Sequence, residues 1–295
     1  MTAKKPAPIA ASTGHGSDTV KLKNCTACRL VKYCSVDCQR AHRKQHKKAC
    51  KKRAAELKDE QLYSQGHERP GGEFCPICTL PIQLPMHEYS VFNLCCMKRI
   101  CNGCAVTAQL KGLTDCAFCR TPLPEDDAEP LAQLMARVEK RDPEAFYYLG
   151  NKYRNGELGL QKDMRKAAEL WTEGAELGSI SAIFSLGNAY YNAEGVEVDK
   201  AKGVQFWTMA AMQGHAQSRY NLGWYEGEKG NYDRAVKHYL ISSKLGDKVS
   251  LEMIRKMFMV GGATKEQFAQ ALQGYQDAVE ETKSYDRDEV KRLEG

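Results

Sequence analysis

The placement of cysteine constrains this chain more than any other feature. All thirteen cysteines of the 295-residue sequence lie between Cys25 and Cys119, most of them in closely spaced pairs. Disulfide frameworks are typical of small secreted domains, but the cysteine count is odd and the first twenty residues contain no apolar run like that of a secretory leader. Repeated C-x-x-C pairs favour zinc instead. We therefore expect zinc modules first and a different kind of fold after Cys119.

The first cysteine cluster is CTACRLVKYCSVDCQRAHRKQHKKAC, residues 25–50. His46 and Cys50 are four residues apart, about one helical turn, so both side chains can reach one metal from the same helix face. The candidate ligands form three pairs: Cys25 with Cys28, Cys34 with Cys38, and His46 with Cys50.

Their order and spacing resemble the MYND zinc finger, an interaction module that binds two zinc ions in crossed fashion. The Tyr33-Cys34 and Cys38-Gln39 pairs match that family. Arg43 occupies the position where the family usually has a tryptophan in its helix. The family's upstream C-x-x-C pair is missing before Cys25. The resemblance implies one complete site and half of a second. The complete site would be Cys25, Cys28, His46 and Cys50, and the half site would be Cys34 and Cys38.

Two alternatives remain for this cluster. His42, one helical turn after Cys38, or His15 in the N-terminal tail would complete the second site. In the other arrangement the four cysteines 25, 28, 34 and 38 share one metal, which leaves His46 and Cys50 free.

The second cluster contains eight cysteines in four pairs, enough for two tetrahedral sites with no ligand left over. Its layout resembles a RING-type finger, in which the first and third pairs hold one zinc and the second and fourth hold another. The resemblance implies one site of Cys75, Cys78, Cys101 and Cys104, and a second of Cys95, Cys96, Cys116 and Cys119.

The weak point of this resemblance is the second pair. Lys98 stands where RING fingers usually carry a histidine, so adjacent Cys95 and Cys96 must serve together. Neighbouring side chains of an extended chain point apart, and the pair therefore needs a kinked backbone. The alternatives are His87 as a substitute ligand, or one buried cysteine beside a single distorted site.

RING domains often act as ubiquitin ligases by docking a ubiquitin-conjugating enzyme, and part of the docking pattern is present. Ile77 in the first knuckle and Arg120 after the last cysteine match the family and are possible conjugating-enzyme contacts. Ala117 replaces the expected proline, and no tryptophan precedes Trp171 to supply the usual central apolar contact.

Beyond the cysteines the chain is repetitive. Three copies occupy 143–179, 180–215 and 216–247, with matching Leu-Gly pairs at 149–150, 186–187 and 222–223. Matching aromatic residues are Trp171, Trp207 and Tyr239, and the copies close with Gly178, Gly214 and Gly246. We expect each copy to be an antiparallel helix pair, with the internal glycines at close helix contacts and the closing glycine in a left-handed turn.

Such units stack into a solenoid because none can bury its apolar face alone. The pattern resembles Sel-one-like repeats, relatives of tetratricopeptide repeats. Asp163 and Asp199 are expected to cap the second helices. A degenerate fourth copy at 248–283 is expected to cap the stack.

The predicted fold class is therefore small zinc-stabilised α+β modules followed by an all-α helical-repeat solenoid. The predicted division is a disordered tail (1–22), a MYND-like finger with its helix (23–63), a linker (64–72), a RING-like finger (73–124), a hinge and helix (125–142), the repeats (143–283) and a charged tail (284–295).

The predicted function is a zinc-binding adaptor, holding about three zinc ions with a fourth left open, that binds other proteins through its repeats and fingers. A ubiquitin ligase whose repeats select substrates is the alternative. Residues 21–60 carry 13 Lys+Arg against 4 Asp+Glu, but Tyr33 is the one aromatic residue among these charges, so nucleic acid is not favoured. Every complete site is closed by four protein ligands, which predicts structural metal. We expect a cytoplasmic or nuclear protein without a membrane span.

Overall fold

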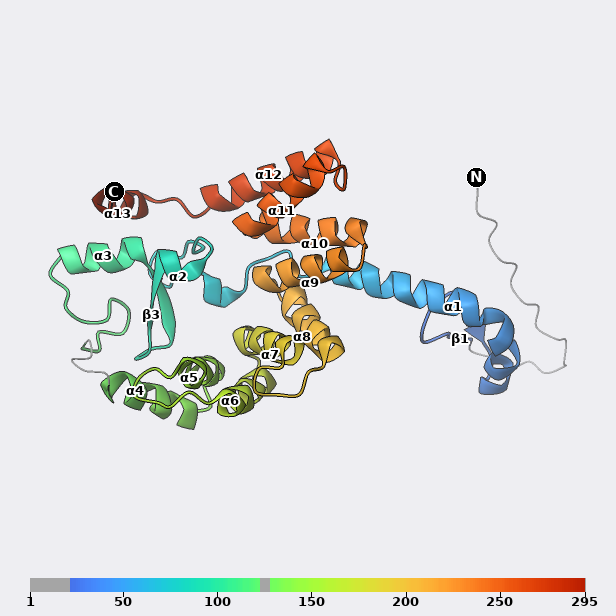
Figure 1. The fold of residues 1–295 in the computed structure, drawn as a ribbon, viewed down its shortest axis with the longest axis horizontal. Coiled ribbons are helices and arrows are strands. Elements are labelled where there is room, and N and C mark those ends of the chain that lie inside the picture. The colour runs from blue at the N-terminus through green and yellow to red at the C-terminus, as the bar shows by residue number, and fades with distance from the viewer. Residues whose placement is uncertain (1–21, 123–127, 295) are drawn as a thin grey trace. The chain divides into compact units, whose positions relative to one another are not determined.

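The computed structural model describes residues 22–122 and 128–294 (Figure 1). The chain divides into two compact units, residues 1–64 and residues 65–295. Nearly all of the predicted disordered tail, the last two residues of the predicted RING-like finger (123–124) and the first three of the predicted hinge (125–127) lie outside the described residues.

The first unit is a two-stranded hairpin followed by one long helix. Strands β1 (Lys23–Asn24) and β2 (Lys32–Tyr33) pair antiparallel, and α1 (Val36–Ser64) follows. The helix contains neither glycine nor proline, which is consistent with its length of 29 residues. The core of the described part of this unit, residues 22–64, is very small, because its buried apolar cluster contains only Cys25, Cys28 and Tyr33.

The second unit begins with a cysteine-rich module. Its elements are a 3-10 turn (Gly71–Glu73), α2 (Met86–Tyr89), β3 (Ser90–Asn93), β4 (Lys98–Cys101) and α3 (Asn102–Leu110). Strands β3 and β4 form an antiparallel hairpin in which Ser90 pairs with Cys101. Ile82 and Ile100 are buried among the cysteines and are the large aliphatic side chains of this core.

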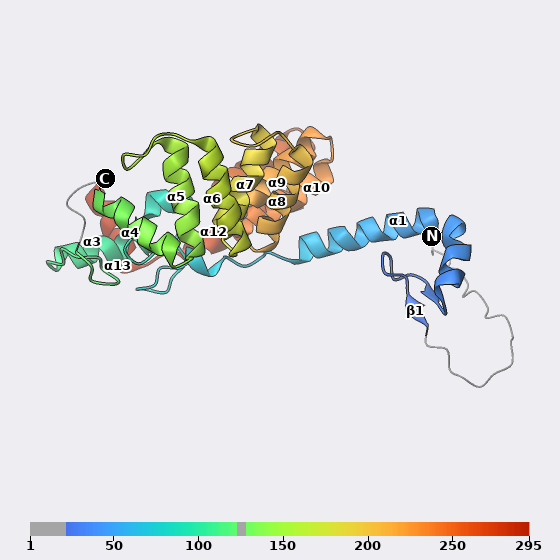
Figure 2. The same ribbon diagram turned by 90° about the horizontal axis from the view of Figure 1, so that it is seen from below.

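A helical array follows (Figures 1 and 2). It starts with α4 (Ala128–Glu139). The four helix pairs are α5 (Pro143–Asn155) with α6 (Met164–Glu176), α7 (Ile180–Asn192) with α8 (Lys200–Met212), α9 (Ala216–Glu228) with α10 (Tyr232–Lys244), and α11 (Lys248–Met259) with α12 (Lys265–Glu280). The array confirms the predicted helix pairs and the predicted fold class.

The repeated Leu-Gly and aromatic positions meet inside each of the first three pairs. A Cβ on Gly187 of α7 would lie 2.3 Å from the Trp207 ring of α8, and one on Gly150 would lie 2.5 Å from the Trp171 ring. The glycine on the first helix therefore leaves space that the aromatic ring of the second helix fills. In the third pair, Gly223 leaves the same space for the Tyr239 ring. This contact explains why the glycine and the aromatic residue recur together in the three repeats.

Caps and turns also follow the sequence. Asp163 and Asp199 accept hydrogen bonds from the backbone N–H groups of Lys166 and Lys202, as expected of N-caps. The closing glycines adopt left-handed φ angles of 98°, 89° and 94° at Gly178, Gly214 and Gly246. Both predictions are confirmed.

The segment predicted as a linker is packed against the repeats. The Arg219 side chain is fully buried, and its Nη2 donates to the backbone oxygen of Gln65 at 2.5 Å. A Cβ on Gly66 would lie 2.0 Å from the backbone oxygen of Ala211, so the two backbones nearly touch. The sequence carries no periodic signal for this contact. No helix in the described part of the chain is long and apolar enough to cross a membrane.

Candidate functional site

Four residues of the N-terminal unit converge on one point. The Sγ atoms of Cys25 and Cys50 are 3.8 Å apart, and Cys28 Sγ lies 3.1 Å from His46 Nε2. All four candidate ligand atoms lie within 4.8 Å of one another. A zinc–sulfur bond of about 2.3 Å gives tetrahedral sulfur–sulfur separations of about 3.8 Å, so this donor set fits the metal.

Cys34 and Cys38 lie elsewhere. Their Sγ atoms are 3.0 Å apart and both residues are exposed. Among the described residues they join no cluster of three or more candidate ligands. His42 Nδ1 is 3.1 Å from the Tyr33 hydroxyl, and His15 lies outside the described residues. The structure thus brings together the four residues of the implied complete site, not the four cysteines of the alternative arrangement.

The eight cysteines of the second module form two clusters. One contains Cys75, Cys78, Cys101 and Cys104, and the other contains Cys95, Cys96, Cys116 and Cys119. Sulfur–sulfur distances of 3.8 Å (78–101), 3.9 Å (96–116) and 3.4 Å (95–119) are far longer than a disulfide bond and suit tetrahedral ligands. The grouping is crossed, first pair with third and second with fourth. His87 is exposed and belongs to neither cluster.

The neighbouring cysteines 95 and 96 lie in the turn between β3 and β4. That turn spans residues 94–97, and Met97 has a left-handed φ of 53°. Cys96 Sγ also donates to the Asn93 oxygen at 3.9 Å, a long sulfur hydrogen bond. A hairpin turn therefore supplies the kinked backbone that two adjacent ligands require.

Three of the four C-x-x-C pairs are knuckles that share one backbone design, whereas the fourth, Cys101 and Cys104, lies at the start of α3. The residue after the second cysteine has a left-handed φ of 55° at Arg29, 61° at Thr79 and 62° at Arg120. In each knuckle its N–H donates to the oxygen of the first cysteine, at 2.8–2.9 Å. This tight turn presents both sulfurs to one side, as a shared metal requires.

Thiol electrostatics differ within a cluster because close sulfurs compete for protons. The hydrogen bond with Cys101 is the main influence on Cys75 and lowers the pKa of its thiol to about 4. Metal ligation needs the thiolate form, which this shift favours at Cys75, whereas the same hydrogen bond raises the pKa of the Cys101 thiol.

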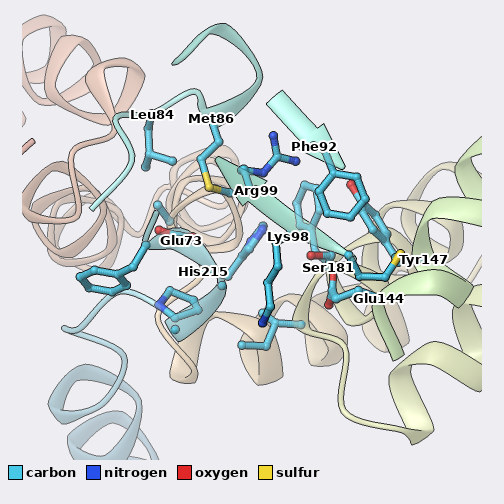
Figure 3. A pocket seen from close by; sticks show the side chains of 18 of the residues that line it. Glu73, Leu84, Met86, Phe92, Lys98, Arg99, Glu144, Tyr147, Ser181 and His215 are labelled. Carbon is cyan, nitrogen blue, oxygen red and sulfur yellow. The ribbon is translucent and has the colours of Figure 1, made fainter. Parts of the chain in front are cut away.

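A cavity of about 620 Å³ lies within the second unit (Figure 3). One wall is formed by the cysteine-rich module at the start of the second unit (the second zinc module), and it includes Glu73, Lys98 and Arg99. The other wall consists of the starts of successive first helices of the repeats. Residues of that wall are Glu144 and Tyr147 of α5, Ser181 and Phe184 of α7, and Gln217 of α9. The volume falls within the range of small-molecule and cofactor pockets.

Burial shifts the charges around this cavity. Burial raises the pKa of Glu73 to about 7, although Arg69 and Arg99 act against it. It also raises the pKa of Glu144, which accepts a hydrogen bond from Ser179 Oγ. Burial thus disfavours the charged form of both carboxyls, while Lys98 is exposed and extends into the cavity (Figure 3). Helix N-termini on the far wall add partial positive charge. The cavity wall thus combines the cations Lys98 and Arg99 with three carboxyls, because Asp247 also lines it.

A second, shallower groove of about 420 Å³ lies on the zinc module. Ile77, Ala117 and Arg120 line it together with α3, and Ile77 is 42% exposed. The two residues predicted to contact a conjugating enzyme therefore lie at one groove, although neither the cavity nor this groove was itself predicted.

Comparison with known families assigns two of the modules. The MYND finger model matches residues 14–50, and the Sel1 repeat model matches residues 143–179, 180–215 and 216–247. The chain therefore contains a MYND finger, a zinc-binding domain, and three Sel1 repeats, with the boundaries predicted for the repeats. These modules define a zinc-finger protein-interaction adaptor.

One curated relative is DAP3-binding cell death enhancer 1 of Rattus norvegicus, 30% identical over 117 residues. The match covers 38% of this chain and 23% of that protein, so the chain spans about a quarter of that relative's length.

Two solved structures resemble the array. A Sel1 repeat protein from Oxalobacter formigenes is 22% identical with a TM-score of 0.48, covering 54% of this chain and 67% of that one. A protective antigen of uropathogenic Escherichia coli with an SLR fold is 26% identical with a TM-score of 0.46, covering 56% of this chain and 36% of that one.

Proposed function

We propose that this adaptor holds a partner protein by an acidic segment in the 620 Å³ cavity between its repeats and second zinc module. The observation that carries the proposal is that the wall opposite the zinc module is built from α5, α7 and α9, one helix from each Sel1 repeat. A segment bound there would contact all three repeats at once. The zinc module contributes Lys98 and Arg99 from β4.

The rat relative is named as DAP3-binding, which makes DAP3 the partner to test first. Thiols grouped for metal without disulfide bonding suit a reducing compartment, the cytoplasm or the nucleus.

The test uses charge reversal at the cavity. Lys98→Glu should weaken DAP3 binding at least about tenfold, because it replaces the exposed cation of the cavity wall with an acid. Lys140→Glu is the matched control, since Lys140 is exposed near the end of α4 and does not line the cavity. Fluorescence anisotropy with purified DAP3 measures both. Equal binding by the two variants, or none by the unmodified chain, would count against this partner and this cavity.

The second candidate is a RING-type ubiquitin ligase. It is supported by the crossed cysteine grouping and by the groove that brings Ile77 and Arg120 together. Against it, Ala117 provides less apolar surface than the expected proline. A self-ubiquitination assay with a panel of conjugating enzymes tests whether the chain is a ligase. A ligase requires transfer by the unmodified chain that disappears in Ile77→Ala and Arg120→Ala with zinc content unchanged, because neither residue is a ligand.

A further inference from the structure

The last helix of the chain packs against the second zinc module. Helix α13 (Tyr285–Glu294) contacts α3, and Val290 is buried there at 5% exposure (Figure 1). A Cβ on Gly103 of α3 would lie 2.8 Å from Arg287 Cγ and 2.9 Å from the Arg287 backbone nitrogen. A side chain at position 103 would thus displace the helix. The residues predicted as a charged tail include a docked helix.

Arg287 carries this contact to the cysteines. Its Nη1 donates to the backbone oxygens of Pro81 at 2.6 Å and Thr282 at 2.7 Å. Its Nη2 donates to Cys78 Sγ at 3.3 Å and to the Leu80 oxygen at 3.4 Å. The guanidinium therefore joins the start of α13, the loop after the first knuckle and one candidate ligand sulfur.

The charge of a loaded cluster gives this contact its importance. Four thiolates around one Zn²⁺ leave a net charge of about −2, which is costly to bury without donors. A guanidinium bonded to a thiolate offsets part of that charge and strengthens the bond itself. The other cluster of this module has different support, since Arg137 donates to the backbone oxygen of Cys95 rather than to a sulfur. The MYND cluster uses a neutral histidine, His46, and carries less charge.

We propose that α13 is a functional part of the metal centre at Cys75, Cys78, Cys101 and Cys104, with Arg287 as its positioning residue. Arg287 offsets the thiolate charge and fixes the knuckle, so bound zinc holds α13 in place and α13 slows zinc loss. Asp286 of the same helix lines the groove that contains Ile77 and Arg120. Loss of zinc from this centre therefore also opens one edge of that groove.

Two tryptic peptides make the test site-specific. Residues 100–111 contain Cys101 and Cys104 of this centre, and residues 112–120 contain Cys116 and Cys119 of the other. The full-length, zinc-loaded chain is treated with N-ethylmaleimide and a zinc chelator, and labelling of each peptide is followed by mass spectrometry. In Arg287→Gln the first peptide should react about tenfold faster or more, while the second keeps its rate. Arg287→Lys, which keeps the charge but loses the fork, should fall between.

Arg292→Gln is the control on the same helix, because Arg292 is exposed and pairs with Glu289 on the surface. It should leave both rates unchanged. Hydrogen exchange supplies the reciprocal measurement: zinc removal should raise exchange in residues 285–294 more than in α12. The proposal is overturned if Arg287→Gln accelerates both peptides equally or neither. Equal labelling of the first peptide with and without zinc in the unmodified chain would overturn it too.

Discussion

The second zinc module and the Sel1 array reach a folded state by different means. The buried core of the module consists mostly of cysteines, with Ile82 and Ile100 as its large aliphatic members. In the array, each of the first three helix pairs places a large aromatic side chain against a glycine, as Trp207 does at Gly187. The array therefore buries apolar surface in every repeat, whereas the module has little apolar surface to bury.

The difference shows what each region needs. A chain segment without a sufficient apolar core requires metal or another crosslink to fold. Sel1 repeats instead gain stability from packing within and between neighbouring units. Removing metal and removing a core aromatic should consequently affect opposite ends of the chain.

Chelation should produce the largest effect. Excess chelator is expected to unfold residues 25–50 and 73–122, because metal binding and folding are coupled in such modules. Helices α5 to α12 should keep most of their circular dichroism signal, and hydrogen exchange resolves the two regions. Returning zinc should restore protection. If the repeats unfold together with the fingers, the two regions are not independent.

Truncating the central aromatic should be the next largest change. Trp207 is 3% exposed and stacks on Tyr191, so Trp207→Ala should lower the free energy of unfolding of the array by about 3–5 kcal/mol. Thermal melting at the helical signal measures this loss, and zinc content should remain unchanged.

The matched variant is Tyr275→Ala in α12. Tyr275 is only partly buried, at the edge of the terminal cluster, and its loss should cost about 1–2 kcal/mol. Comparable losses at both positions would contradict an array whose fourth, degenerate pair is its weakest unit.

Acid should weaken the array by a smaller amount through a buried histidine. His238 is 1% exposed, and burial, with Arg219 and Arg234 nearby, lowers its pKa to about 3. The unfolded chain takes up a proton below about pH 6.5 while the folded chain does not, so this stability is present above that pH and is lost as pH falls. Between pH 7 and about pH 5.5 the loss is about 1 kcal/mol.

His238→Gln isolates the effect. Its stability should fall about 1 kcal/mol less than that of the unmodified chain over the same pH interval, measured by urea unfolding. The comparison cancels Glu73, whose raised pKa acts with the opposite sign, because its folded-state proton is lost as pH rises toward 7. It also cancels His215, whose pKa is lowered to about 4 by burial. Parallel pH profiles for the two chains would exclude His238 as the cause.

The sequence predicted those parts of the fold that depend on periodic or closely spaced residues. Repeat boundaries, the caps at Asp163 and Asp199 and the turn glycines all follow from local pattern. Contacts between distant segments were not predicted. The hydrogen bonds from Arg219 to Gln65 and from Arg287 to Cys78 produce no periodic pattern in the sequence, because each depends on one side chain and one partner.

For the candidate sites, the local parts were likewise predicted from the sequence, and the contacts between distant segments were not. Knuckle spacing indicated which cysteines act in pairs, since the pair is a local structure. How pairs combine was implied by family resemblance, because it depends on chain crossing rather than spacing. The cavity beside Lys98 was missed entirely, as its walls come from segments more than forty residues apart.

The smallest expected effect concerns Cys34 and Cys38, and it tests the same contrast inside one finger. Both are exposed and lie outside the cluster of Cys25, Cys28, His46 and Cys50. Changing both to serine should leave about three zinc ions per chain in native mass spectrometry, one for each four-ligand cluster. The matched change of Cys25 and Cys28 to serine removes two ligands of the assembled cluster and should reduce the count to about two. If the 34/38 variant instead loses one zinc ion, the second MYND site is complete and uses a ligand from outside the described residues or a rearranged His42.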